Sequence, residues 1–110
     1  MSTFGLSIDF EACKLNHSSF FGMDLRNCRF EDCQMQNCEF GEANLKGVSF
    51  KRNDLLNSSF NYCDLQKSDW RGSFNISLDP RENQLSGAKF SKESLADLLA
   101  VFKIVVDEKT

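Results

Sequence analysis

The sequence predicts an all-β solenoid, in which the chain coils repeatedly in one direction, followed by a short α-helix at its C-terminal end. Two observations predict the coil: large apolar residues recur at every fifth position, and smaller residues recur two positions before them. A third observation, a change to helical spacing after residue 90, predicts the helix. The chain has 110 residues, which is the length of a single domain.

The five-residue period begins at position 10 and continues without a slip to position 70. A helix places apolar residues three or four apart and a strand places them two apart, so neither element explains a spacing of five. We expect these large side chains to fill the interior of the coil. The expected core residues are Phe10, Leu15, Phe20, Leu25, Phe30, Met35, Phe40, Leu45, Phe50, Leu55, Phe60, Leu65 and Trp70.

A second register, two residues before each large one, is mostly small and holds all five cysteines. Random placement would put five cysteines in one register roughly one time in 600, so the period is not accidental. Asn53 interrupts this small register, and we expect it to be hydrogen-bonded in the core or at a local turn. The register two residues after the large one is rich in Asn, Asp and Gly, which tolerate the backbone angles of turns. Two inward positions and one turn in every five residues describe stacked coils joined by backbone hydrogen bonds.

This pattern resembles the pentapeptide-repeat family over residues 8–72. The resemblance implies a right-handed quadrilateral β-helix of about four coils, in which four pentapeptides complete a coil and residues twenty apart stack. Two aromatic stacks and two aliphatic stacks would then fill one narrow core. The implied aromatic stacks are Phe10, Phe30, Phe50 and Trp70 on one side, and Phe20, Phe40 and Phe60 on the other.

The period breaks in residues 73–84, which contain the only proline, and returns briefly in residues 83–90. From Ser91, a suitable N-cap, the apolar spacing becomes that of one helix face. We therefore divide the chain into a pentapeptide-repeat β-helix, residues 1–90, and a C-terminal helix and tail, residues 91–110. The open end of a solenoid needs a cap, but this segment carries more apolar surface than a narrow end requires, so we expect both a cap and a homodimer seam. The expected seam residues are Leu95, Leu98, Leu99, Phe102, Ile104 and Val106.

Two short segments resemble the Qnr and MfpA type of pentapeptide-repeat protein. Residues 77–81, Ser-Leu-Asp-Pro-Arg, followed by a leucine-rich helix, resemble its C-terminal end, and residues 4–10 resemble the junction before its long C-terminal run of coils. The resemblance implies that this chain corresponds to the C-terminal portion of such a protein, without the N-terminal coils. It further implies a homodimer through the C-terminal helix, and binding to DNA gyrase and topoisomerase IV by DNA mimicry, which is linked to fluoroquinolone resistance.

The charge of the chain weakens the comparison with DNA. The formal net charge is −3, so a homodimer would carry only −6. Duplex DNA of the expected dimer length, ~40 Å, carries about 23 phosphates. The alternative is a rigid structural or adaptor module that binds other proteins and has no topoisomerase activity.

Other kinds of site have little support in the sequence. Cys28, Cys33 and Cys38 could converge in the core, but they have no fourth ligand for a zinc ion. The single histidine, His17, falls in the outward turn register, and no glycine-rich phosphate loop is present. The N-terminus has neither the basic nor the apolar part of a secretory signal, and no run of 18 apolar residues occurs. We expect a cytoplasmic, non-enzymatic protein with reduced thiols, and no cofactor, metal, membrane, direct nucleic-acid or small-molecule ligand.

A few outward residues are candidates for contact with a partner protein. Three are apolar side chains in otherwise polar registers, although scattered apolar surface is also common on proteins without any partner. Four are acidic side chains that would form an acidic stripe if they shared one wall of the coil. The candidate partner-binding residues are Phe21, Leu56, Tyr62, Asp24, Glu42, Asp64 and Asp69.

Overall fold

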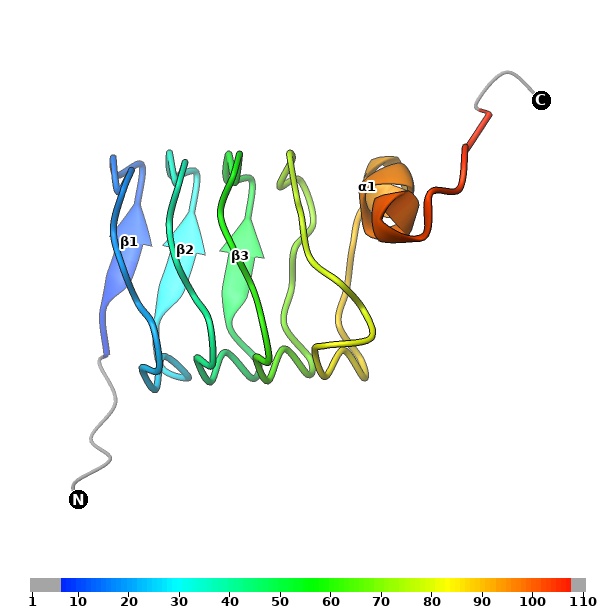
Figure 1. Cartoon of the computed structure of the whole chain (residues 1–110). Helices are drawn as coiled ribbons and strands as arrows, with labels where there is room; N and C mark the ends of the chain where they lie inside the picture. The colour runs from blue at the N-terminus through cyan, green and yellow to red at the C-terminus, as the bar shows by residue number, and fades with distance from the viewer. Residues whose placement is uncertain (1–6, 108–110) are drawn as a thin grey trace.

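The computed structural model describes residues 7–107 and shows a chain that coils along one axis, with a helix across one end (Figure 1). Three short strands, β1 (Asp9–Glu11), β2 (Arg29–Glu31) and β3 (Ser49–Lys51), form a parallel sheet in the order β1-β2-β3. Residues 1–6 and 108–110 lie outside the described part, so the first three residues of the expected junction at 4–10 do as well.

Residues twenty apart in the sequence are paired along the whole coil. In the sheet, Phe10 is paired with Phe30 and Phe30 with Phe50. Isolated parallel bridges repeat the same offset in three further rows, so each turn of the coil has four sides. We name these sides the Phe10 wall (residues 8–12, 28–32, 48–52 and 68–72), the Leu15 wall (13–17, 33–37 and 53–57), the Phe20 wall (18–22, 38–42 and 58–62) and the Leu25 wall (23–27, 43–47 and 63–67).

Stacked aromatic rings fill the space between the Phe10 and Phe20 walls. The rings of Phe30 and Phe50 lie 5.0 Å apart and nearly parallel, and those of Phe20 and Phe40 lie 4.9 Å apart. Rings of the two stacks meet edge to face, as Phe30 and Phe40 do at 5.9 Å, which is the arrangement that aromatic quadrupoles favour. The aliphatic side chains between the stacks are fully buried in the middle of the coil, namely Leu25, Met35, Leu45, Leu55 and Leu65.

The small register supplies the hydrogen bonds that the buried backbone needs. The fully buried Asn53 accepts a hydrogen bond from the Cys33 N–H at 2.9 Å and donates one to the Phe30 carbonyl at 2.8 Å. The Cys63 thiol, at the equivalent position of the Leu25 wall, donates to the Phe40 carbonyl at 2.9 Å. The expectation that Asn53 is hydrogen-bonded in the core is confirmed, and a cysteine in this register acts as a donor as well as a filler.

The corners of the coil lie in the expected turn register. Asn37, Asn57 and Gly47 have φ values of 58°, 62° and 74°, the left-handed region that Asn and Gly tolerate. Glu42 and Tyr62 adopt the same conformation, with φ of 59° and 56°. For side chains of this kind the conformation is uncommon, so the coil imposes it.

The C-terminal segment differs from the single helix expected after Ser91. A 3₁₀ turn at Lys92–Ser94 leads into α1 (Leu95–Leu99), and a second 3₁₀ turn follows at Ala100–Phe102. Ser91 precedes the first turn but does not cap it, because its hydroxyl instead accepts a hydrogen bond from the Gly72 N–H at 2.7 Å. The expected capping bond is therefore wrong: the hydroxyl ties this segment to the last regular coil.

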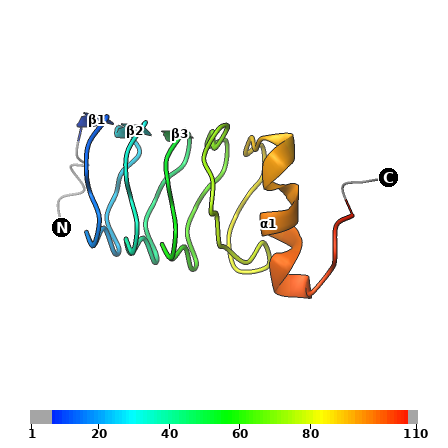
Figure 2. The same cartoon turned by 90° about the horizontal axis from the view of Figure 1, so that it is seen from above.

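Figures 1 and 2 both show α1 lying across the C-terminal end of the coil. Leu98 packs against the core from this position, while Ile76 and Leu78, from the irregular segment, are buried beneath the coil's last turns. The period of five did not identify Ile76, which stands outside the inward registers. Within residues 7–107 no helix has the length and apolar character needed to cross a membrane.

Candidate functional site

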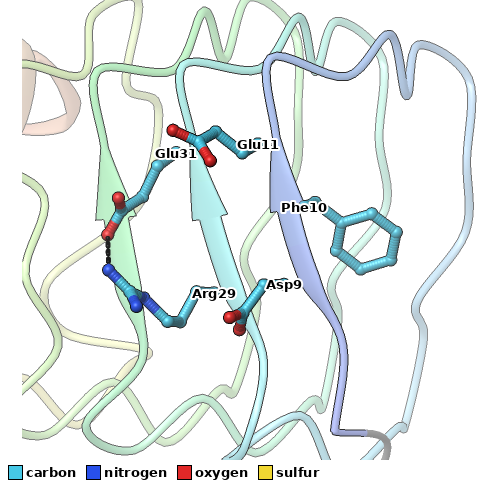
Figure 3. Close-up of a pocket in the computed structure, with 5 residues that line it drawn as sticks. All are labelled: Asp9, Phe10, Glu11, Arg29 and Glu31. Carbon is cyan, nitrogen blue, oxygen red and sulfur yellow. Dashed lines mark hydrogen bonds and ion pairs between the residues drawn. The ribbon is translucent and has the colours of Figure 1, made fainter.

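The interior of the coil is filled by side chains, so any site must lie on its outer walls or at its ends. A small depression of about 110 Å³ lies over β1 and β2 and is lined by Asp9, Phe10, Glu11, Arg29 and Glu31 (Figure 3). Figure 3 shows the Arg29 guanidinium turned toward Glu31 and the Phe10 ring pointing away from the charged groups. The Nη2 of Arg29 lies 3.0 Å from Oε2 of Glu31.

Glu31 is held as a carboxylate by its neighbours. The Ser49 hydroxyl donates a hydrogen bond to it at 2.7 Å, and this bond, followed by that from Arg29, lowers the pKa of Glu31 below its ordinary value. A general acid needs the opposite, a raised pKa that keeps a proton available near neutral pH. Glu31 is therefore suited to the surface ion pair with Arg29 and not to the role of a general acid.

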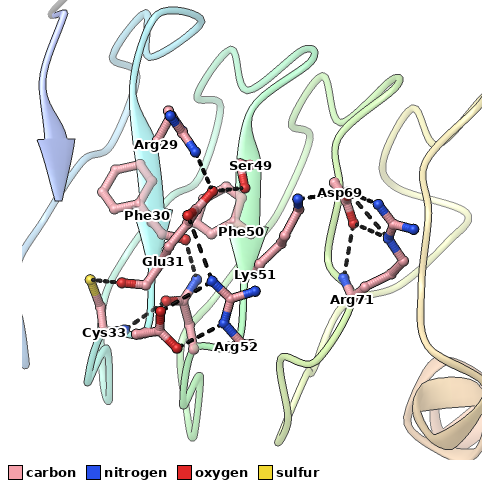
Figure 4. Close-up of polar contacts among 12 residues, drawn as sticks. Arg29, Phe30, Glu31, Cys33, Ser49, Phe50, Lys51, Arg52, Asp69 and Arg71 are labelled. Carbon is pink, nitrogen blue, oxygen red and sulfur yellow. Dashed lines mark hydrogen bonds and ion pairs between the residues drawn. The ribbon is translucent and has the colours of Figure 1, made fainter. Parts of the chain in front are cut away.

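The same kind of pairing continues along the Phe10 wall (Figure 4). Arg52 lies 2.8 Å from Asp32 and 3.7 Å from Glu31. Arg71 lies 2.7 Å from Asp69 and is the main reason that the pKa of Asp69 is lowered. Carboxylates on this wall alternate with guanidinium groups, so the wall presents local dipoles instead of an unbroken negative stripe.

The four acidic candidates lie on three different walls. Asp24 and Asp64 share the Leu25 wall, where Asn44 is bridged to both, whereas Asp69 is on the Phe10 wall and Glu42 is at a corner of the Phe20 wall. Asp24 is also paired with Arg26 at 2.7 Å. The structure therefore does not assemble these four side chains into one acidic stripe of the kind a DNA mimic needs.

The apolar candidates Phe21 and Tyr62 do lie together. Their side chains are 53 % and 67 % exposed, and both line a groove of about 220 Å³ on the Phe20 wall with Glu39, Gly41, Glu42 and Asn61. Leu56 is exposed on the Leu15 wall and belongs to another surface. Nothing in the sequence pattern marks Gly41 or Glu39 as part of a site. The twenty-residue stacking does place Gly41 beside Phe21, at the equivalent position of the next coil.

The C-terminal end leaves apolar side chains in contact with solvent. Leu95 and Ile104 are 51 % and 52 % exposed, and Phe102 is also exposed, while Leu98, Leu99 and Val106 are half-buried. The Arg81 guanidinium lies 4.8 Å from the centre of the Phe102 ring. Val101 and Val105 extend this apolar surface beyond the six residues expected from the helical spacing.

The remaining chemistry-bearing residues of the described chain form no further site. Burial raises the pKa of the Cys33, Cys38 and Cys63 thiols, so these cysteines are poor nucleophiles. His17 is exposed at a corner of the Leu15 wall, with φ of 67°. Among residues 7–107 no three His, Cys, Asp or Glu side chains converge where they could hold a metal ion.

Comparison with known proteins agrees with this geometry. A sequence profile of the pentapeptide repeat region matches residues 6–75, while no curated protein sequence matches significantly. The crystal structure of HetL, a pentapeptide repeat protein involved in heterocyst differentiation regulation in Nostoc sp. strain PCC 7120, superposes with a TM-score of 0.63 at 19 % identity, over 69 % of this chain and 35 % of HetL. At that identity the likeness shows the fold alone.

Two further structures superpose only loosely. A pentapeptide repeat protein from the Arabidopsis thaliana thylakoid lumen has a TM-score of 0.43 at 18 % identity, over 70 % of this chain and 61 % of that one. A trypsin-treated form of QnrB1, a plasmid-mediated fluoroquinolone resistance protein, has a TM-score of 0.37 at 14 % identity, over 90 % and 91 % of the two chains. The chain thus spans about a third of HetL and less than two thirds of the Arabidopsis protein.

Proposed function

The chain belongs to the pentapeptide repeat family, and from that premise we propose that it is a non-enzymatic scaffold that binds other proteins through its outer walls and its C-terminal end. One observation carries the proposal: the core is filled, and exposed apolar residues include a pair on the Phe20 wall and a larger group in and after α1. Exposed apolar surface of this kind is typical of protein-binding sites. From the family's fold we also infer a right-handed coil of about four turns.

We propose that the C-terminal end forms a homodimer seam, and that residues 91–110 act as both cap and seam. Leu98 packs on the core and supports the cap, whereas Leu95, Phe102 and Ile104 remain exposed and would be covered by the second copy. Fully burying a side chain of this size contributes roughly 1.5–3 kcal/mol. Several such side chains in one patch therefore favour association strongly.

DNA gyrase and topoisomerase IV are the second candidate for the target of this scaffold, with a link to fluoroquinolone resistance and a cytoplasmic setting. The support is the resemblance of residues 77–99 to the C-terminal end of the Qnr and MfpA type, together with the exposed apolar surface at that end. The spread of the acidic residues over three walls weighs against imitation of a DNA backbone. Binding through shape and apolar contact remains compatible with the geometry.

A gyrase supercoiling assay, run with and without a quinolone, separates the two candidates. Protection or inhibition at micromolar protein would support the topoisomerase target, and no effect from a chain shown to be a folded dimer would leave the adaptor function. The Leu95→Arg chain is the matched control for dimerisation, because it places a charge in the proposed seam without entering the core. A wild-type chain that is monomeric by light scattering at this concentration would contradict the proposed seam.

A further inference from the structure

We propose that the groove on the Phe20 wall, between the rings of Phe21 and Tyr62, binds an arginine side chain presented by a partner protein. This inference rests on the proposed protein-binding function and names the chemistry that one of its surfaces recognises. The groove is lined by two aromatic rings, two carboxylates, a glycine and an asparagine, and it has a volume of about 220 Å³. Together these groups match the apolar stem, planar head and positive charge of arginine.

Gly41 creates the floor of the groove. A Cβ added at Gly41 would lie 3.0 Å from both Cδ2 and Cε2 of the Phe21 ring and 3.9 Å from the Asn61 carbonyl oxygen. The Phe21 ring therefore lies over the next coil, along the surface of the wall, and a side chain in place of Gly41 would crowd the ring. Its other face remains open, since the side chain is 53 % exposed.

The charge in the groove has no counterion among the described residues. Residues 18–22, 38–42 and 58–62 contain no lysine or arginine, and Glu39 and Glu42 are their only charged residues. Neither of these carboxylates forms an ion pair with another described residue, whereas Glu31, Asp32 and Asp69 on the Phe10 wall all do. The Phe20 wall is thus complementary to a cation and repels phosphates and acidic segments.

The chain itself contains the arrangement that the groove lacks. At the C-terminal end, the Arg81 guanidinium lies 4.8 Å from the centre of the Phe102 ring and forms an ion pair with Asp79 at 2.8 Å. There the guanidinium contacts both an aromatic ring and a carboxylate of the same chain. Within the described part of the Phe20 wall the ring and the carboxylates are present and the guanidinium is missing, so the geometry points to one supplied by another molecule.

Arginine fits this groove better than lysine does. A guanidinium stacks on an aromatic face and forms two parallel hydrogen bonds to a carboxylate, whereas an ammonium is a compact, strongly hydrated charge. The groove is lined by both aromatic rings and carboxylates, and this combination favours a planar cation.

The test is an NMR titration of the full chain with a glycine–serine peptide that carries one central arginine, at low ionic strength. We expect the Gly41 and Tyr62 amide signals to shift with millimolar peptide, and the matched citrulline peptide, which has the same shape without the charge, to shift them far less. The lysine peptide should fall between the two. Equal shifts with arginine and citrulline, or shifts confined to other walls, would overturn the proposal.

Two double variants distinguish the groove from general surface charge. The double variant Glu39→Gln with Glu42→Gln should lower the affinity for the arginine peptide by about tenfold, because both carboxylates of the groove are lost. Asp9→Asn with Glu11→Gln removes two carboxylates from the Phe10 wall and should leave the affinity unchanged. Equal losses from both double variants would show non-specific attraction and reject the groove.

The outcomes also separate this inference from the proposed function on which it rests. A folded dimer that alters gyrase activity but gives no peptide shift at Gly41 would overturn the arginine groove alone. A chain that binds the peptide in the groove and has no effect on gyrase would support the inference together with the adaptor function.

Discussion

The coiled body, residues 8–72, and the C-terminal segment, residues 91–107, differ in how far their apolar side chains are buried. In the body, Phe30, Phe40 and Phe50 are fully buried, each between the rings twenty residues before and after it. In the C-terminal segment, Leu95 and Ile104 remain about half exposed. The side chains of the body are buried because each coil is covered by the next, whereas nothing in the described chain covers the outer side of the C-terminal segment.

Buried polar groups show the same contrast. In the body, inward side chains such as Asn53, Ser58 and Cys63 hydrogen-bond the backbone of the preceding coil. At the end, Ser91 bonds the last coil and leaves the first helical turn without a side-chain cap. Stability therefore resides in the repetition, and the features available for assembly and recognition lie where the repetition stops or faces outward.

The largest expected effect comes from placing a charge inside the body. Phe40→Asp should unfold the chain, because it replaces a stacked ring with an unpaired carboxylate, and losing the ring alone costs about 3–5 kcal/mol. Thermal unfolding followed by circular dichroism would measure it. Phe21→Asp, on the outer side of the same wall, is the matched control and should stay folded. A folded Phe40→Asp chain would contradict the inward placement of this residue.

A smaller loss is expected when the ring stacks are kept and one interior hydrogen-bonding side chain is removed. Asn53→Leu leaves the Cys33 N–H and the Phe30 carbonyl without their partner, and each orphaned buried group costs about 1–3 kcal/mol. Urea unfolding would give the difference in free energy. Gln34→Leu, on the outer face of the same wall, should change stability by less than about 0.5 kcal/mol. Equal effects from the two variants would show that the interior bonds contribute nothing measurable.

At the C-terminal end the same kind of change should alter assembly instead of folding. Leu95→Arg is expected to give a folded monomer, because this side chain is already 51 % exposed in the single chain. Leu98→Arg should destabilise the chain as well, since Leu98 packs against the core. Light scattering and thermal unfolding, measured on both variants, separate cap from seam. An unchanged dimer mass for Leu95→Arg would remove this residue from the seam.

The smallest effect belongs to the ion pairs on the outside of the body. The folded-state pKa of Glu31 is lowered, first by the Ser49 hydrogen bond and then by Arg29, so its stabilisation is present above the ordinary pKa of about 4.3 and is lost as the pH falls through the lower folded value. Glu31→Gln should flatten the acid side of the stability curve by less than about 1 kcal/mol, because such pairs are solvent-screened. Urea unfolding between neutral and acidic pH would measure this. Glu11→Gln, which loses a carboxylate without an ion pair among the described residues, is the control, and an identical acid slope in wild type and Glu31→Gln would deny Glu31 this role.

The five-residue period is enough to predict much of the body. It places Phe30, Phe40 and Leu45 inward, and these side chains are fully buried. It also places Asn53 in the core, where it is hydrogen-bonded. The period succeeds because each inward position depends on local repetition: every pentapeptide makes the same turn, so one register always faces the same direction.

The outer surfaces are harder to predict from the sequence. Asp24, Glu42, Asp64 and Asp69 look like one acidic group in the sequence but lie on three walls. Two of them, Asp24 and Asp69, are paired with the arginines two residues later in the chain. Ile76 is buried although it stands in neither inward register. The burial of Ile76 depends on packing against the core of the coil, whereas the wall of each acidic residue follows from its position around the four-sided coil.

The sequence by itself determined the period, the inward side chains and the position of the C-terminal helical segment, since each follows from spacing within a few residues. Only the tertiary structure decided that Phe21 folds over Gly41, that Glu39 and Glu42 have no counterion within residues 7–107, and that Leu98 is covered while Leu95 is not. The physical reason is that exposure and pairing are properties of neighbours in space. In a coil those neighbours are set by the register between turns, which backbone pairing creates and no single repeat contains.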